Sequence, residues 1–293
     1  MTHDHMTGDV VVALGAELGE GPVWDVRTGR LVWVDIVGRA VHATDPASGD
    51  TDSITVPLHV GAVVPRAAGG FLAALQDGFS VIGDGPPRPV ASVEHAAPGE
   101  FRLNDGKCDP AGRFWAGSIA YDESSGRSAL YRLDADGSVT TMLAGVSISN
   151  GLAWSADGST MFYIDTPTRR IDAFAFDVAT GSISDRRTVV TIGDGLGYPD
   201  GMTIDADGGL WVALWGGGAV HRYLDGRLDA VVDLPVSQPT SCAFGGAAFD
   251  ELYVTSAWKG FDADRRAAEP LAGALFRVHP GVRGPAPDVF GAP

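Results

Sequence analysis

Apolar residues in this chain fall in short runs that alternate with polar turns. Six such runs recur along the sequence: LVWVD (31–35), FLAAL (71–75), FWAGS (114–118), MFYID (161–165), LWVAL (210–214) and LYVTS (252–256). Their first residues are separated by 40, 43, 47, 49 and 42 positions. No segment sustains the 3.6-residue apolar period of an amphipathic helix. The pattern predicts a protein built from repeated units of short β-strands.

Each unit holds more than one strand. A turn precedes most of the runs, as in SADGST (155–160), and a second strand-like segment follows most of them, as in RIDAFAFD (170–177). Every unit therefore supplies three or four antiparallel strands, and one such small sheet cannot cover both of its own faces. Six sheets stacked radially bury each other's faces and leave only short edges. The chain is predicted to be an all-β, six-bladed β-propeller.

The N-terminal run DVVVAL (9–14) has no unit of its own. We expect it to add an outer strand to the blade built from residues 240–280 and so to close the ring. Residues 1–8 are polar and are expected to form a flexible tail before a single propeller domain over residues 9–293. The start of the chain has no apolar signal core, and no run approaches the ~20 apolar residues of a membrane span. A cytoplasmic protein is expected.

One position in most units carries an oxygen-bearing side chain directly before a glycine or aspartate. The frames are LGEGPVWD (18–25), RLNDGKCD (102–109), ISNGLAWS (148–155) and YPDGMTID (198–205). Across the six units the equivalent residues, called the slot residues below, are Glu20, Val60, Asn104, Asn150, Asp200 and Thr240. The innermost strand of each propeller blade borders the central channel. Slot residues at the starts of these strands should therefore form a ring at one mouth of the channel.

Two carboxylates and two amides on one ring would favour a bound cation. Glu20 and Asp200 would repel each other in a partly dry channel, which raises the pKa of at least one. All-oxygen ligands suit hard divalent ions such as Ca²⁺, Mg²⁺ or Mn²⁺, although carboxylates also bind Zn²⁺. Asp and Asn before Gly are also ordinary turn residues, which accounts for any single slot. It does not account for four slots on one ring, one of them a Glu.

Composition narrows the choice of partner. The formal net charge of −16 repels phosphate backbones and anionic lipid, so neither nucleic acid nor membrane is an expected partner.

The two cysteines, Cys108 and Cys242, lie far apart without metal-ligand spacing and are expected to be small buried groups. No GxSxG motif of a serine hydrolase occurs.

The four frames, together with SAWKGF (256–261) and EPLAGALFRV (269–278), resemble the regucalcin, gluconolactonase and luciferin-regenerating enzyme family. The resemblance runs from about Glu20 to Val278 and implies a six-bladed propeller that hydrolyses a sugar lactone with a divalent metal. It implies Glu20, Asn150 and Asp200 as metal ligands, with Ca²⁺ the favoured ion and Zn²⁺, Mn²⁺, Mg²⁺ or Fe²⁺ as alternatives. Asn104 would border metal and substrate, and Arg102 would contact substrate hydroxyls.

The segment SIAYDESSG (118–126) departs from the family pattern. Asp122 is our match for the family's substrate-facing Glu, with Glu123 and Tyr121 as alternatives. The metal would act as a Lewis acid on the lactone carbonyl oxygen, and Asp200 is the preferred base for the attacking water. A second carboxylate or a metal-bound hydroxide could take the place of Asp200, because metal ligation lowers basicity.

Three other functions compete with a lactonase on this scaffold. A calcium-dependent phosphotriesterase could use a similar oxygen ring on the same scaffold. A non-catalytic metal-binding propeller would gain nothing from Arg102 beside its metal. A strictosidine-synthase-like condensing enzyme would need pocket features that this chain lacks. Whether the lactone is a hexonate or a pentonate, and whether the protein forms oligomers, is not encoded in these patterns.

Overall fold

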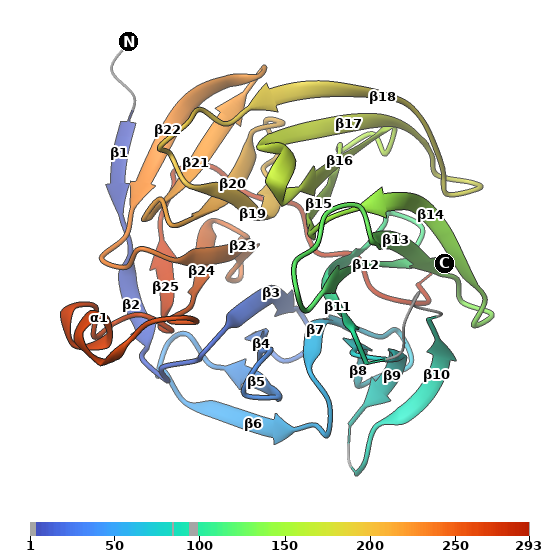
Figure 1. The fold of residues 1–293 in the computed structure, drawn as a ribbon, viewed down its shortest axis with the longest axis horizontal. Coiled ribbons are helices and arrows are strands. Elements are labelled where there is room, and N and C mark those ends of the chain that lie inside the picture. Colours follow the sequence, from blue (N-terminus) through green and yellow to red (C-terminus); the bar gives the residue numbers. More distant parts are fainter. Residues whose placement is uncertain (1–3, 84, 94–98, 293) are drawn as a thin grey trace.

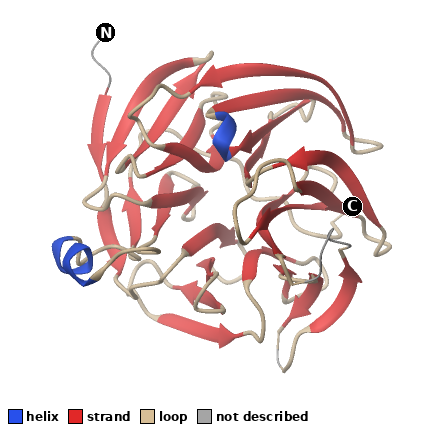
Figure 2. Ribbon diagram, in the orientation of Figure 1, coloured by secondary structure: helices blue, strands red, loops and turns tan. Residues whose placement is uncertain are grey.

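The strand repeats form six antiparallel sheets arranged around a central channel (Figures 1 and 2). The computed structural model describes residues 4–83, 85–93 and 99–292. Nearly all its regular structure is strand; the helical elements described are the 3₁₀ turn η1 (Thr166–Thr168) and α1 (Ala263–Ala268). The predicted six-bladed β-propeller is confirmed.

The first three blades follow one another along the chain. Blade I contains β3 (Gly19–Asp25), β4 (Arg30–Asp35), β5 (Ala40–Thr44) and β6 (Thr51–Thr55). Blade II contains β7 (Val60–Pro65), β8 (Phe71–Leu75), β9 (Gly78–Ile82) and β10 (Arg88–Ser92). Blade III contains β11 (Phe101–Cys108), β12 (Phe114–Ala120), β13 (Ser128–Leu133) and β14 (Val139–Val146).

The next three blades complete the ring. Blade IV contains β15 (Ser149–Trp154), β16 (Thr160–Asp165), β17 (Arg170–Asp177) and β18 (Ser182–Thr191). Blade V contains β19 (Tyr198–Ile204), β20 (Leu210–Trp215), β21 (Ala219–Leu224) and β22 (Arg227–Asp233), with β1 (Asp4–Thr7) added outside. Blade VI contains β23 (Pro239–Gly245), β24 (Glu251–Ser256), β25 (Leu275–Val278) and β2 (Asp9–Val12).

The hydrophobic core lies between the blades. Six clusters of buried residues occupy the six interfaces around the ring. The cluster between blades II and III, for example, joins Phe79 to Phe114, whose ring centroids lie 5.5 Å apart in an edge-to-face arrangement. Between blades VI and I, Tyr253 stacks on Trp24 with centroids 6.0 Å apart. Radial stacking therefore covers the faces that a single blade leaves exposed.

The N-terminal segment closes the ring as predicted but begins earlier than predicted. β2 pairs antiparallel with β25 and is the outer strand of blade VI. Residues 4–7, which the sequence assigned to a flexible tail, instead form β1 and pair in parallel with β22. The assignment was wrong for these residues because strand pairing uses backbone groups, and DHMT, with Met6 as its one apolar residue, carries no apolar alternation that would signal a strand. Residues 1–3 lie outside the described residues.

The chain ends by crossing the second mouth of the channel. Ala206 N donates to Arg283 O, Phe290 N donates to Pro65 O at 2.9 Å, and Gly291 N donates to Gly112 O. These contacts tie the C-terminal segment to blades V, II and III. The described part of the chain contains no helix with the length and apolar character that a membrane crossing requires.

Candidate functional site

Every inner strand shifts its register near the slot residue. The shifts fall between the following pairs of residues: Glu20 and Val23, Val60 and Ala62, Leu103 and Gly106, Asn150 and Leu152, Pro199 and Met202, Pro239 and Ser241. A β-bulge of this kind bends the strand and redirects its side chains. The inner strands contact one another in ring order, from β3 through β23 and back to β3. The slot residues consequently surround one mouth of the channel.

The glycines after the slots allow this close approach. A Cβ on Gly61 would lie 2.2 Å from Asn104 O of the next blade, and one on Gly201 would lie 2.0 Å from Ser241 Oγ. A Cβ on Gly151 would lie 2.9 Å from Asp200 O. The glycine of one blade therefore packs against the slot residue of the next blade, or against the residue that directly follows it. Turn chemistry alone does not explain the glycines that follow the slot residues.

Two aspartates at the ends of second strands fix the chain where it enters the inner strand. Asp35 accepts hydrogen bonds from Glu17 N at 3.0 Å and Leu18 N at 3.1 Å, directly before Glu20. Asp165 accepts one from Ile148 N at 2.9 Å, two residues before Asn150. These bonds hold the segments that carry two of the predicted metal ligands.

A chain of hydrogen bonds joins the polar slot residues of blades III and IV to Arg102. Arg102 Nη1 donates to Asn104 Oδ1 at 2.5 Å, and Asn104 Nδ2 donates to Asn150 Oδ1 at 2.8 Å. Asn150 Nδ2 in turn donates to Thr166 Oγ1 at 2.8 Å. Arg102, Asn104 and Asn150 are all buried. The structure thus brings three of the predicted site residues into direct contact.

The carboxylates of Glu20 and Asp200 complete this cluster. They are 5% and 7% exposed. Burial raises the pKa of Glu20 well above its ordinary value, and the negative charges of Asp200 and Asp105 raise it further. Burial and the charge of Asp105 likewise raise the pKa of Asp200. Arg102 opposes both shifts but does not cancel them. Without a further positive charge, the cluster disfavours ionisation of its carboxylates.

The donor set fits a hard divalent cation. Among the described residues, no three His, Cys, Asp or Glu side chains are grouped so that they could hold a metal ion. A cation here would therefore rely on an amide oxygen as well as on Glu20 and Asp200, and Asn150 Oδ1 is the amide oxygen available. Carboxylate and amide oxygens are ligands that Ca²⁺ accepts, and a cation would relieve the repulsion that raises both pKa values.

The two remaining slots are structural. Val60 is fully buried in the cluster between blades I and II. Thr240 donates from Oγ1 to Gly19 O at 2.6 Å and also contacts Thr255 Oγ1 at 2.8 Å. The Thr240 bond to Gly19 joins blade VI to blade I beside Glu20. The ring is polar only over part of its circumference.

The structure does not bring Asp122 to the cluster. Its side chain is 62% exposed; it accepts bonds from Ser124 and pairs with Arg127 at 3.2 Å. The Asp122 carboxylate thus finds its hydrogen-bond and ion-pair partners within this turn and points to solvent, away from the channel. Tyr121 takes a different direction, and its hydroxyl lies 2.6 Å from His59 Nδ1. Burial lowers the pKa of Arg102, and the charges that oppose this shift include those of Tyr121 and Glu123 but not that of Asp122.

Sequence reasoning missed Asp105 and Thr166. Asp105 follows Asn104 within the bulge of β11, and its carboxylate acts on both Glu20 and Asp200. Two consecutive oxygen-bearing residues in RLNDGKCD were the available signal for Asp105. Thr166 reaches Asn150 from η1, after the second strand of the blade, and carried no recognisable signal.

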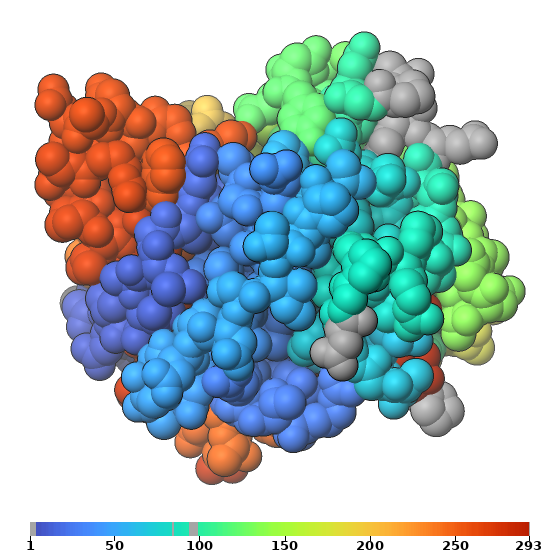
Figure 3. Space-filling view, turned by 90° about the horizontal axis from the view of Figure 1, so that it is seen from below, coloured from blue at the N-terminus to red at the C-terminus, as the bar shows by residue number. Residues whose placement is uncertain are grey.

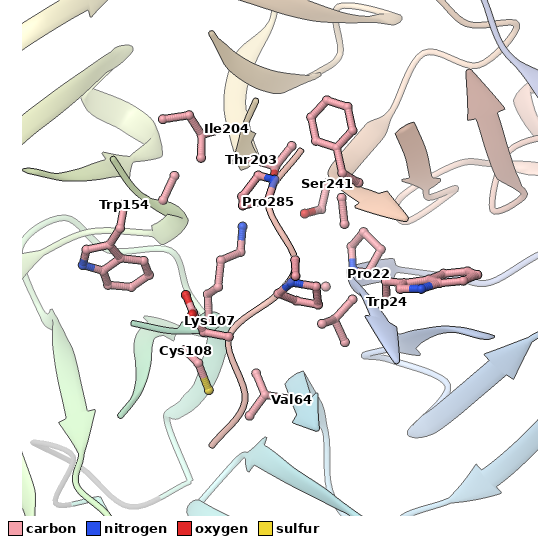
Figure 4. Close-up of a pocket in the computed structure, with 18 of the residues that line it drawn as sticks. Pro22, Trp24, Val64, Lys107, Cys108, Trp154, Thr203, Ile204, Ser241 and Pro285 are labelled. Carbon is pink, nitrogen blue, oxygen red and sulfur yellow. The ribbon is translucent and has the colours of Figure 1, made fainter. Parts of the chain in front are cut away.

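A cavity of about 310 Å³ lies at the other end of the channel from the slots (Figure 4). Trp24 and Trp154 border it, and the segment with Pro285 crosses it. Lys107 points into it and donates from Nζ to Met202 O at 2.7 Å. Cys108 lines the cavity, and both it and Cys242 are buried free thiols, as expected. None of the slot residues lines the cavity, but Gly21, Asp105 and Ser241, which directly follow three of them, do.

Comparison with known proteins identifies relatives over nearly the whole chain. The model of the SMP-30/Gluconolactonase/LRE-like region matches residues 18–258. Regucalcin of Xenopus laevis is 39% identical over 292 residues, covering 96% of this chain and 97% of that protein. YvrE of Bacillus subtilis (strain 168), which is named for a sugar lactone lactonase activity, is 37% identical over 265 residues, covering 89% of this chain and 90% of YvrE.

A solved structure matches the fold of this chain over its whole length. The calcium-binding protein regucalcin from Agrobacterium tumefaciens superposes with a TM-score of 0.94 at 31% sequence identity, and the match covers 100% of both chains. The similarity therefore includes the N-terminal strands and the C-terminal segment as well as the six blades.

Proposed function

Because this chain belongs to the SMP-30/gluconolactonase/LRE-like family, we propose that it hydrolyses a sugar lactone at the channel mouth, with a divalent cation held by Glu20, Asn150 and Asp200. The observation that carries the proposal is the buried cluster itself. Two carboxylates with raised pKa values stand beside two oriented amides and one arginine. A purely structural site would not require an arginine so close to its cation.

The lactonase activity is supported by the relatives. YvrE is named as a sugar lactone lactonase, and the family takes part of its name from gluconolactonase. The Agrobacterium tumefaciens regucalcin is described as a calcium-binding protein, which supports Ca²⁺ as the preferred ion. These properties belong to those proteins and come to this chain as part of the proposal.

The bound cation would place positive charge beside the lactone carbonyl oxygen, where negative charge develops as water attacks. Asp200 would accept the proton of the attacking water. Arg102 is held in place through Nη1 and would offer its other N–H groups to substrate hydroxyls. Asn104 would orient both Arg102 and the oxygen of Asn150, since its amide bonds to each.

The decisive experiment removes the cation and restores it. The full chain is stripped with a chelator, Ca²⁺, Zn²⁺, Mn²⁺, Mg²⁺ or Fe²⁺ is added back, and acid release is followed from a panel of hexonate and pentonate lactones. We expect no turnover in the stripped protein and recovery with at least one ion. An organophosphate fluoride assayed in parallel separates lactonase from phosphotriesterase activity. Lactone turnover that is identical with and without chelator would contradict the proposal.

A further inference from the structure

An ion pair connects two blades on opposite sides of the ring. Lys259 Nζ lies 3.6 Å from Glu123 Oε1. Glu123 belongs to the segment between β12 and β13 of blade III, and Lys259 follows β24 of blade VI. Two blades separate III from VI in either direction around the ring, as Figure 1 shows. The two side chains can therefore meet only across the channel.

This contact lies over the mouth that holds the slot residues. The end of β12 pairs with the start of β11, where Phe101 is opposite Ala120, and Glu123 comes three residues later. The end of β24 pairs with the start of β23, where Pro239 is opposite Ser256, and Lys259 again comes three residues later. Both residues thus leave their blades at the end of the channel where the inner strands begin. In Figure 3 the orange-red segment after β24 and green residues of the opposite side rise at the same edge of the molecule.

The electrostatics agree with this placement. Burial raises the pKa of Asp200, and the positive charge of Lys259 is among the influences that oppose this rise. Burial lowers the pKa of Arg102, and the negative charge of Glu123 is among the influences that oppose this fall. Each member of the pair is therefore close enough to influence a residue of the site. Lys259 is also one of two lysines in the whole sequence.

The backbone at each end favours the contact. Glu123 adopts φ of +53°, a left-handed conformation that is uncommon for a residue other than glycine, and its N–H donates to Ala120 O at 2.9 Å. Lys259 O accepts a hydrogen bond from Gln238 Nε2 at 3.3 Å, and the following Gly260 has φ of +80°. The turns direct two long side chains toward each other, although both remain partly exposed.

We propose that Glu123 and Lys259 form a bar across the mouth that makes the site selective for compact lactones. Lactones without a large substituent would pass beside the bar, whereas a lactone with a long acyl or aromatic substituent would need the pair to separate. This inference rests on the proposed lactonase function. It names Glu123 and Lys259 as specificity-determining residues, with no part in the chemical step.

The strength of the bar can be bounded. Ion pairs with both partners exposed contribute little, so the closed mouth should be favoured over the open one by about fivefold at most. A substrate that requires the open mouth then loses up to the same factor in kcat/KM. Salt should weaken the bar by screening the exposed charges.

The test compares two substrates in the full chain. kcat/KM is measured for an unsubstituted aldonolactone and for the same lactone with a long acyl chain on a ring hydroxyl. We expect Lys259→Ala and Glu123→Ala each to raise the ratio of bulky to compact turnover by up to about fivefold. The charge exchange Glu123→Lys with Lys259→Glu should return the ratio toward that of the unmodified chain.

Asp52→Ala provides the matched control, since Asp52 pairs with Arg30 on the outside of blade I, away from the mouth. It should leave the ratio unchanged. A ratio that stays constant in both alanine variants, or one that the charge exchange fails to restore, would overturn the proposal.

A measurement without substrate separates the bar from the proposed function. Cysteines introduced as Glu123→Cys and Lys259→Cys should be joined within one chain by a short bis-maleimide, because the two side chains meet across the channel. The native Cys108 and Cys242 are buried and should react too slowly to compete. The intact mass reports the cross-link. Failure to cross-link would contradict the proposed bar. Successful cross-linking in a protein that hydrolyses no lactone would contradict only the proposed activity.

Discussion

Thr166 fixes the orientation of the Asn150 amide. The Thr166 hydroxyl donates to Pro199 O at 2.7 Å and must therefore accept the bond from Asn150 Nδ2 at 2.8 Å. With the amide nitrogen held by Thr166, Asn150 Oδ1 is the atom left to face Asn104 and the channel. A residue outside the ring thus decides which atom of Asn150 a cation would meet.

Thr166→Val should weaken cation binding by about 10- to 100-fold, because partners that orient metal ligands typically have effects of this size. The substitution keeps the shape of the side chain and removes only the hydroxyl. Calorimetric titration of the stripped protein with Ca²⁺ measures the change. Thr168→Val is the control, since that hydroxyl in the same turn donates to Asp165 O instead. Equal affinity in the two variants would show that Thr166 does not orient Asn150.

Glu20→Ala and Asp200→Ala should each abolish metal-dependent lactone hydrolysis and leave the propeller folded. Each removes one of the two carboxylates expected to hold the cation, and neither residue belongs to the apolar clusters between the blades. Turnover with saturating cation and a circular dichroism spectrum measure the two effects. Full activity in both variants would remove the site assignment.

The cation-free protein should lose stability through these carboxylates as pH rises. Both have raised pKa values in the folded state, whereas in the unfolded chain they ionise near their ordinary values of about 4. Above that pH the unfolded chain releases protons that the folded protein retains, so ionisation favours unfolding. Below it both states are protonated and the effect vanishes.

Glu20→Gln isolates this contribution. In chelator, the Tm of the variant should exceed that of the unmodified chain, and the difference should grow as pH rises above about 4. Saturating Ca²⁺ should reverse the order, because only the unmodified chain retains the full ligand set. A Tm difference that is independent of pH would contradict the electrostatic account.

Gly61→Ala should destabilise the protein by about 1–3 kcal/mol or more. The new Cβ would lie 2.2 Å from Asn104 O and 2.5 Å from Leu103 O, which are backbone atoms that no side-chain rotation can move away. Denaturation by urea measures the loss. Gly83→Ala is the control, because its Cβ would meet nothing within 4 Å. If the two variants unfold at the same urea concentration, the blades do not pack as closely at Gly61 as the structure indicates.

The sequence by itself determined the repeat and the positions of the slots. Strand alternation and turn residues are local properties, so runs such as LVWVD and LWVAL predicted the blades without tertiary information. The recurrence of one turn frame, with successive slots separated by 40, 44, 46, 50 and 40 residues, placed Glu20, Asn104, Asn150 and Asp200 on equivalent strands. The pairing of residues 9–12 with the last blade also followed, because that blade otherwise lacked an outer strand.

Only the tertiary structure decided where individual side chains point and what they meet. Asp122, Glu123 and Tyr121 are consecutive, and a single turn sends Asp122 to solvent while Glu123 reaches Lys259 across the channel. Thr166 reaches Asn150 because a 3₁₀ turn follows β16. Such contacts depend on bulges, turns and ring closure that bring distant segments together, and no local periodicity records them.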